Sequence, residues 1–212
     1  MPEAGLVFLA KGLGIGFLIA APVGPIGLLC IRRTLAHGRA SGLVSGLGAA
    51  TADAMYGSIA GFGLTAVSAF LTGQEASFRI LGGLFLLSLG VVTMRAKPAA
   101  ESAKANDAGL LKDYLSTLFL TLTNPLTILS FAAIFTGLGI VRAQSHAAAG
   151  TLVLGVFLGS AAWWLILSGA VGAVRERFGP PVMRWVNVIS GLAICGFGGW
   201  ALAAAARQAM AR

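Results

Sequence analysis

Long apolar segments separated by short polar stretches dominate the sequence. Six such segments are evident, at 12–32, 42–71, 78–94, 114–141, 147–173 and 185–206. A membrane-spanning helix needs about 20 predominantly apolar residues, and a shorter one fits where the bilayer thins or the helix stands upright. The pattern therefore predicts an all-α membrane protein with six transmembrane helices.

The composition agrees with this pattern. Hydrophobic residues make up 57% of the 212 residues and charged residues 10%, whereas soluble domains are about 45–50% apolar and about 25% charged. Lipid is therefore expected to be the main solvent of the chain, and six spans leave no room for a separate soluble domain.

The first and fourth segments share a proline break at a similar depth. The residues concerned are Pro22, Gly24 and Pro25 in the first segment, and Thr123, Asn124 and Pro125 in the fourth. The second and fifth segments also align, with Gly46 opposite Gly155 and Thr51 opposite Ser160. Three spans per half invert the second half relative to the first, as in many secondary transporters. We therefore predict inverted three-helix repeats at 1–95 and 113–212, joined by a cytoplasmic linker at 96–112.

These breaks are candidates for a binding site. Proline lacks an N–H group and clashes with the preceding turn, so both helices should stop and restart there. Exposed backbone groups are tolerated at membrane depth only where protein buries them or a cavity hydrates them. The breaks are thus predicted to face each other across a polar centre, where helix N-termini attract a carboxylate and freed carbonyls attract an ammonium group. A small zwitterionic substrate supplies both groups; the alternative is a purely structural kink.

Asp53 lies midway along the second segment, where insertion of a charged residue costs about 2.5–3.5 kcal/mol. Acids at such depth mark substrate or proton pathways. Asp53 is expected to bind a substrate amino group or to carry a coupling proton, with Thr51 and Tyr56 flanking it. The alternative is a structural acid that hydrogen-bonds a broken helix. Its counterpart in the second half is Ala162, so the site should lie closer to the first half.

Other polar and aromatic residues have plainer interpretations. His37 and His146 are expected in solvated loops. Trp163 and Trp164 could line a cavity, but packing against lipid or helices is the preferred interpretation. Asn187, Ser190 and Gly191 are expected at the centre or in helix contacts. Arg32 and Arg33 are expected to anchor the cytoplasmic membrane interface, with binding of a substrate carboxylate during entry as the alternative.

The net charge of +8 is interpreted as a topology signal rather than as a nucleic-acid surface. Ten basic residues lie in the first, third and fifth loops and five on the other side, and cytoplasmic loops carry the Lys/Arg excess. Both termini are therefore predicted to be periplasmic. Cys30 and Cys195 form no CxxC motif, so no metal, cofactor or disulfide is expected. Small residues on several helices permit a homodimer without requiring one.

Three motifs together resemble the lysine exporter (LysE) family of amino-acid efflux proteins. They are Ala20-Ala21-Pro22-Val23-Gly24-Pro25 followed by Arg32-Arg33, then Gly48-Ala49-Ala50-Thr51-Ala52-Asp53-Ala54, then Thr123-Asn124-Pro125. The resemblance implies export of amino acids or related metabolites across the bacterial inner membrane, driven by the proton gradient and without enzymatic activity. It leaves the substrate open.

Two other classes of function remain to be weighed. A membrane-embedded redox carrier would need a cysteine pair or another reactive group in the core, which the sequence does not offer beyond Asp53. A non-transporting scaffold would need a docking surface that loops this short do not provide. In a scaffold, substitutions of Pro22, Pro25 and Asn124 would harm folding alone.

Overall fold

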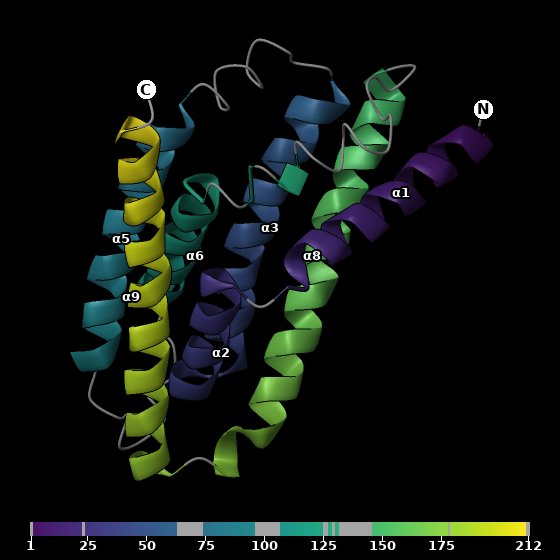
Figure 1. The fold of residues 1–212 in the computed structure, drawn as a ribbon. Coiled ribbons are helices and arrows are strands. Elements are labelled where there is room, and N and C mark those ends of the chain that lie inside the picture. The colour runs from purple at the N-terminus through teal and green to yellow at the C-terminus, as the bar shows by residue number, and fades with distance from the viewer. Residues whose placement is uncertain are drawn as a thin grey trace.

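A computed structural model describes residues 2–22, 24–62, 74–95, 107–124, 127–128, 130–131, 146–177 and 179–210, and the regular structure in these ranges is helical. The helices are α1 (Pro2–Ala20), α2 (Pro25–His37), α3 (Arg39–Gly61), α5 (Glu75–Arg95), α6 (Asp107–Leu122), α8 (His146–Val174), the 3₁₀ turn η1 (Arg175–Arg177) and α9 (Pro180–Met210). They form a bundle in which α1 begins and α9 ends at the same end (Figure 1).

Several of the predicted spans match these helices. Within the described ranges, 77–95, 146–174 and 181–208 are each long and apolar enough to cross a membrane. The pair α1 and α2 forms a fourth candidate if it is one span bent by 79°. Parts of the predicted second and fourth spans, at 63–71 and 132–141, lie outside the described residues. The chain is therefore an α-helical membrane protein.

The break between α1 and α2 falls within the predicted proline motif. Helix α1 ends at Ala20, and α2 restarts with Pro25 at its first position. Proline suits that position because its missing N–H group would have had no partner there. Gly24 precedes it in an extended conformation (φ −113°, ψ −165°) and contributes no side-chain cap. The first amides of α2 are therefore left for another partner.

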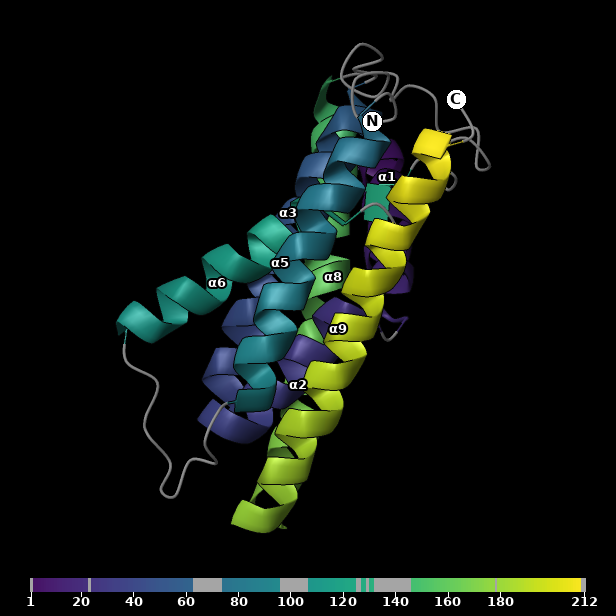
Figure 2. The ribbon, with the colours of Figure 1, turned by 60° about the vertical axis from the view of Figure 1, so that its left-hand side comes forward.

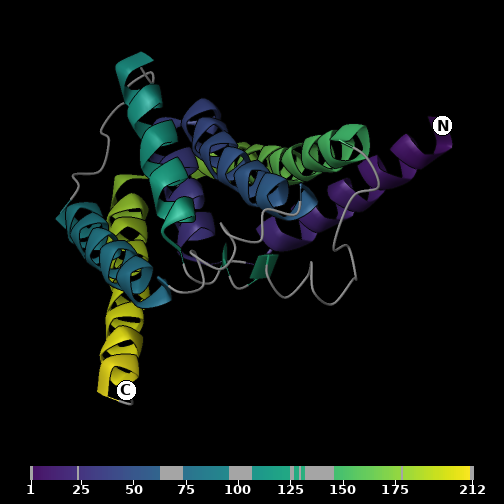
Figure 3. The same ribbon diagram turned by 90° about the horizontal axis from the view of Figure 1, so that it is seen from above.

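The helices pair across the two halves of the chain. Helix α1 packs along α8, α6 packs along α3, α3 packs against α8, and α5 packs against α9. Figure 2 shows α5 beside α9, and Figure 3 shows α1 beside α8 at the far side of the bundle from that pair. Each of these four interfaces joins a helix from before residue 96 to one from after residue 106.

Glycines allow two of these interfaces to close. A Cβ atom on Gly12 or Gly16 of α1 would overlap the backbone of α8, and one on Gly155 or Gly159 of α8 would overlap the backbone of α1. The α5–α9 pair follows the same principle in an antiparallel sense, with Gly83 against Gly198 and Gly90 against Gly191. Small residues permit such close approach where lipid supplies no hydrophobic drive for association.

Large apolar side chains face outward over the same helices. Examples are Leu84 on α5, Ile166 on α8 and Leu192 on α9, which are 54%, 55% and 58% exposed. Buried positions include many hydroxyl groups, such as those of Thr117, Ser160 and Thr34. This distribution is the one expected when hydrocarbon surrounds the bundle and polar groups pair inside it.

A matched pair of substitutions on α1 tests the close helix packing. Gly16→Ala should destabilise the protein by about 1–3 kcal/mol, because the added methyl group overlaps the backbone of Val156. Gly14→Ala, half a turn away with nothing within 4 Å of the added atom, should be neutral or stabilising by up to about 1 kcal/mol. Thermal unfolding of the purified protein in detergent measures both; equal behaviour of the two variants would contradict this packing.

Candidate functional site

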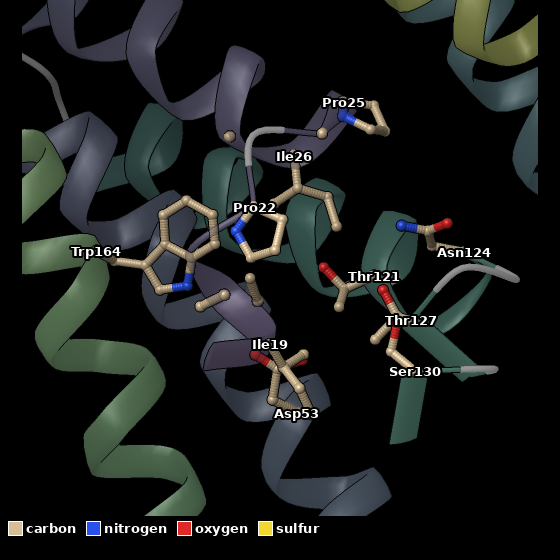
Figure 4. A pocket seen from close by; sticks show the side chains of 14 residues that line it. Ile19, Pro22, Pro25, Ile26, Asp53, Thr121, Asn124, Thr127, Ser130 and Trp164 are labelled. Atoms are coloured by element: carbon tan, nitrogen blue, oxygen red, sulfur yellow. The ribbon is translucent and has the colours of Figure 1, made fainter. Parts of the chain in front are cut away.

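A cavity of about 240 Å³ lies beside the α1–α2 break. Its walls come from α1, α2, α3, α6, α8 and the short helical stretch around Ser130, so both halves of the chain contribute. Figure 4 shows Trp164 on one side of the break and a group of polar side chains on the other, with Asp53 below Pro22. The lining residues are Ile19, Ala20, Pro22, Gly24, Pro25, Ile26, Gly27, Ala49, Asp53, Thr121, Asn124, Thr127, Ser130 and Trp164.

Asp53 is held in this cavity by a chain of hydrogen bonds from α8. The Ser160 hydroxyl donates to Asp53 Oδ2 at 2.7 Å, and Trp164 Nε1–H donates to Ser160 Oγ at 3.1 Å. Because the indole can only donate, it occupies an acceptor site of Ser160 and leaves the hydroxyl proton for the carboxylate. Asp53, Ser160 and Trp164 are 3%, 0% and 3% exposed, so these two hydrogen bonds are shielded from competing solvent.

The indole itself depends on a glycine of the first half. A Cβ atom on Gly46 of α3 would overlap the Trp164 side chain. Gly46 is one of the positions at which the two halves align in sequence, opposite Gly155. The absent side chain at Gly46 therefore lets the indole reach Ser160 beside Asp53.

The opposite wall is polar but uncharged. Thr121 is in the last turn of α6, and Asn124, Thr127 and Ser130 follow the end of that helix. All four lie on one side of the break in Figure 4. Ile19 and Ile26 supply apolar surface. Among the described lining residues, Asp53 is the one ionisable side chain, so the cavity favours a group that carries positive charge.

The N-terminus of α2 provides a complementary feature. Gly24, Ile26 and Gly27 line the cavity, and no side chain caps this helix end. The first amide groups of an α-helix lack intrahelical acceptors and carry the positive end of the helix dipole. They suit an anion such as a carboxylate. The cavity lining therefore combines one acidic side chain, Asp53, with the uncapped N-terminus of α2.

The residues singled out from the sequence are only partly gathered here. Pro22, Gly24, Pro25, Asp53 and Asn124 line the cavity, and Pro125 lies outside the described residues. Tyr56 and Thr123 do not line it. The Tyr56 hydroxyl donates to the carbonyl of Leu122 at 2.6 Å, where α6 ends, and the Thr123 hydroxyl donates to the carbonyl of Phe119.

Other sequence candidates also have defined places. Trp164 is no mere packing residue, since it lines the cavity and donates to Ser160, whereas Trp163 packs edge-on against Phe17. Asn187 accepts a hydrogen bond from Arg32 on α2 at 3.2 Å, away from the cavity. His37 and His146 are the last residue of α2 and the first of α8 rather than loop residues.

Thr121, Thr127, Ser130, Ser160 and Trp164 were not predicted as site residues. Thr121, Thr127 and Ser130 follow or precede the second break by only a few positions, which is the signal that would have found them. The alignment of Ser160 with Thr51 indicated the correct turn of α8. Neither the hydrophobic periodicity of the helices nor the spacing of residues in the sequence indicates that Ser160 contacts Asp53, 107 positions away.

Two serines on α8 provide a test of the Asp53 hydrogen bond. Ser160→Ala removes the donor of a buried carboxylate and should cost about 1–3 kcal/mol of stability. Ser168→Ala should cost less, because the equally buried Ser168 hydroxyl donates only to carbonyls of its own helix, Trp164 O and Leu165 O. Thermal unfolding in detergent compares the two; a larger loss for Ser168→Ala would argue against the assignment.

Comparison with known proteins agrees with this arrangement. The family model described as LysE type translocator matches residues 17–204. Among curated proteins, the chain is 27% identical over 190 residues to the "Putative amino acid efflux protein YcgF" of Bacillus subtilis, covering 87% of this chain and 90% of that one. It is 31% identical over 158 residues to the "Uncharacterized membrane protein YahN" of Escherichia coli, covering 70% and 69%.

No solved structure matches the chain. The family match covers most of the sequence, including both break motifs and Asp53. The chain therefore belongs to the family of LysE type translocators, which are membrane transporters rather than enzymes.

Proposed function

We propose that the protein is a secondary exporter of amino acids or related small metabolites across the bacterial inner membrane, coupled to protons. The observation that carries the proposal is the position of Asp53, buried in a cavity at the helix break and held by Ser160 from the other half. A deep acid in a cavity between packed helices suits substrate binding and proton transfer. The relative named as an amino acid efflux protein supports the same direction of transport.

The cavity chemistry favours a zwitterion. The Asp53 carboxylate would accept the α-ammonium group, and the free amides of Ile26 and Gly27 would donate to the α-carboxylate. The hydroxyl groups of Thr121, Thr127 and Ser130 can satisfy a small polar side chain. A volume of about 240 Å³ is below the range of about 300–1,000 Å³ typical of drug-sized ligands, which suits a small solute.

We further propose six spans arranged as two inverted three-helix repeats. In this arrangement α1 corresponds to α6, α3 to α8 and α5 to α9. The pairing of the described helices supports it, because the contact of α1 with α8 then has its counterpart in the contact of α6 with α3. The α3–α8 and α5–α9 contacts each join a helix to its own counterpart in the other half. An axis in the membrane plane makes self-paired helices antiparallel, as the Gly83–Gly198 and Gly90–Gly191 contacts are. The cavity then lies at the repeat interface, where such transporters bind their substrates.

The orientation is proposed from the basic residues. The ends of α2, α5 and α8 and the starts of α3, α6 and α9 carry the larger share of Arg and Lys, and we call this the basic end of the bundle. By the positive-inside rule the basic end faces the cytoplasm. Both termini, which lie at the opposite end of the bundle (Figure 1), are then periplasmic.

Replacement of Asp53 tests the exporter directly. Asp53→Asn in proteoliposomes loaded with mixed amino acids should lower proton-driven efflux by about tenfold or more, since losing one partner of a buried charge pair costs at least about 2 kcal/mol. The remaining flux should lose its dependence on the imposed pH gradient.

Ser58→Ala is the matched control for this variant, because Ser58 lies on the same helix, donates only to the Ala54 carbonyl and is outside the cavity. It should leave efflux unchanged at equal protein content. Unaltered flux and unaltered pH dependence in Asp53→Asn would refute the proposed role of Asp53. No selective flux of any amino acid from the unmodified protein would refute the exporter itself.

Substrate analogues test the zwitterion. Whichever amino acid is exported, its methyl ester and its N-acetyl derivative should each compete poorly, by about tenfold or more, because each loses one charge-assisted contact worth about 1.5–3 kcal/mol. Competition assays of efflux measure this. An ester that competes as well as the parent amino acid would rule out the α2 N-terminus as a carboxylate site.

A further inference from the structure

A second buried polar cluster lies away from the cavity and is centred on Arg33. Arg33 is 5% exposed, and its Nε forms an ion pair with Asp113 Oδ1 at 3.1 Å. Its other nitrogens donate to the Ser45 hydroxyl at 2.9 Å, to the Thr117 hydroxyl at 2.8 Å and to the Ser116 hydroxyl at 2.8 Å. Ser41 donates to the other oxygen of Asp113.

This cluster joins the two halves of the chain at the basic end. Arg33 is near the end of α2, Ser41 and Ser45 are in the first turns of α3, and Asp113 and Thr117 are on α6. Apart from these contacts, α6 packs chiefly on α3 and touches α2 only lightly. The Arg33–Asp113 pair is therefore the main direct connection between α2 and α6.

The cluster lies in line with the cavity along α2. Ile26 lines the cavity, and Arg33 is two turns further, about 10 Å at 1.5 Å per residue. Between them Leu29 and Cys30 of α2 and Leu120 of α6 fill the space and are 0%, 2% and 0% exposed. An apolar layer followed by a polar layer thus separates Asp53 from the basic end.

We infer that the Arg33–Asp113 ion pair is a gate that closes the Asp53 cavity toward the basic end of the bundle. The inference rests on the proposed export function, since an exporter must at some stage open its site to the side from which the substrate comes. Opening separates α2 from α6, which parts Arg33 from Asp113 and moves Leu29 and Cys30 away from Leu120. A substrate can then pass between them to Asp53.

The composition of the cluster suits a contact that forms and breaks. A buried ion pair is held firmly while it is dry, whereas the same pair in water contributes little, because hydration replaces the attraction. The hydroxyl of Ser45 on α3 can still accept from the guanidinium after α6, with Asp113 and Thr117, has withdrawn. Arg33 therefore keeps a partner on α3 when α6 withdraws, and entering water stabilises the separated carboxylate.

The chain contains a natural reporter for this gate. Its two cysteines are Cys30, in the apolar layer, and Cys195, on α9. In a Cys195→Ser background, Cys30 is the single thiol. Its labelling by a membrane-impermeant maleimide, applied from one side of the membrane at a time, reports how often the layers open toward that side.

The test variant combines Arg33→Gln with Asp113→Asn, so that no unpaired charge is left buried. Labelling of Cys30 from the basic end should rise about tenfold, as expected if the closed state loses 1.4 kcal/mol. The variant removes a positive and a negative charge near Cys30 together, so their opposite effects on the thiol offset each other and an increase in labelling reports opening. The milder variant Ser45→Ala with Thr117→Val keeps the ion pair and should give a smaller rise, and it carries the test if the first variant does not fold.

Arg32→Gln is the matched control, because Arg32 is the adjacent cation but bonds Asn187 on α9 instead of α6. It should leave labelling unchanged. Wild-type labelling rates in the gate variants, or an equal rise in Arg32→Gln, would overturn the gate. Because labelling needs no transported amino acid, this outcome is distinguishable from failure of the export assay.

Discussion

The break between α1 and α2 is the feature on which the rest of this bundle depends. A helix interrupted inside a membrane leaves amides and carbonyls that hydrocarbon cannot satisfy. The chain therefore surrounds the break with protein: α8 covers α1 through glycine contacts, and the end of α6 faces the break with Thr121 and Asn124. The space that remains is a polar cavity, which a soluble bundle of the same helices would have no need to form.

The carboxylates of Asp53 and Asp113 are each bonded by side chains from the other half of the chain. Asp53 on α3 is bonded by Ser160 on α8, and Asp113 on α6 is bonded by Arg33 on α2. Neither contact lies within one half, so a relative motion of the halves must strain or break them. This coupling gives a physical route by which protonation or binding at Asp53 can bias the state of the proposed gate.

The prediction from sequence was most successful where a signal was local. The spans at 78–94 and 147–173 agree with α5 and α8 to within three residues, because apolar runs of that length have a single stable form in lipid. The break was found from Pro22 and Pro25 for an equally local reason. For Trp164, packing was preferred over a place in a cavity wall, since nothing in the sequence places an indole opposite Gly46 or beside Ser160. Arg33 was interpreted as an interface anchor, although its ion pair with Asp113 buries it.

The sequence by itself therefore determined that lipid surrounds the chain, where helices form, where the first span breaks, and that one acid lies deep in the membrane. All of these follow from hydropathy, from the missing N–H of proline and from the cost of a charge in hydrocarbon. Only the tertiary structure decided which groups meet: Ser160 with Asp53, Arg33 with Asp113, and α1 with α8 rather than with α3. Those choices depend on how backbones approach at glycines and on which donor faces which acceptor across helices. Such contacts join residues 80 to about 140 positions apart, beyond the reach of any periodic pattern.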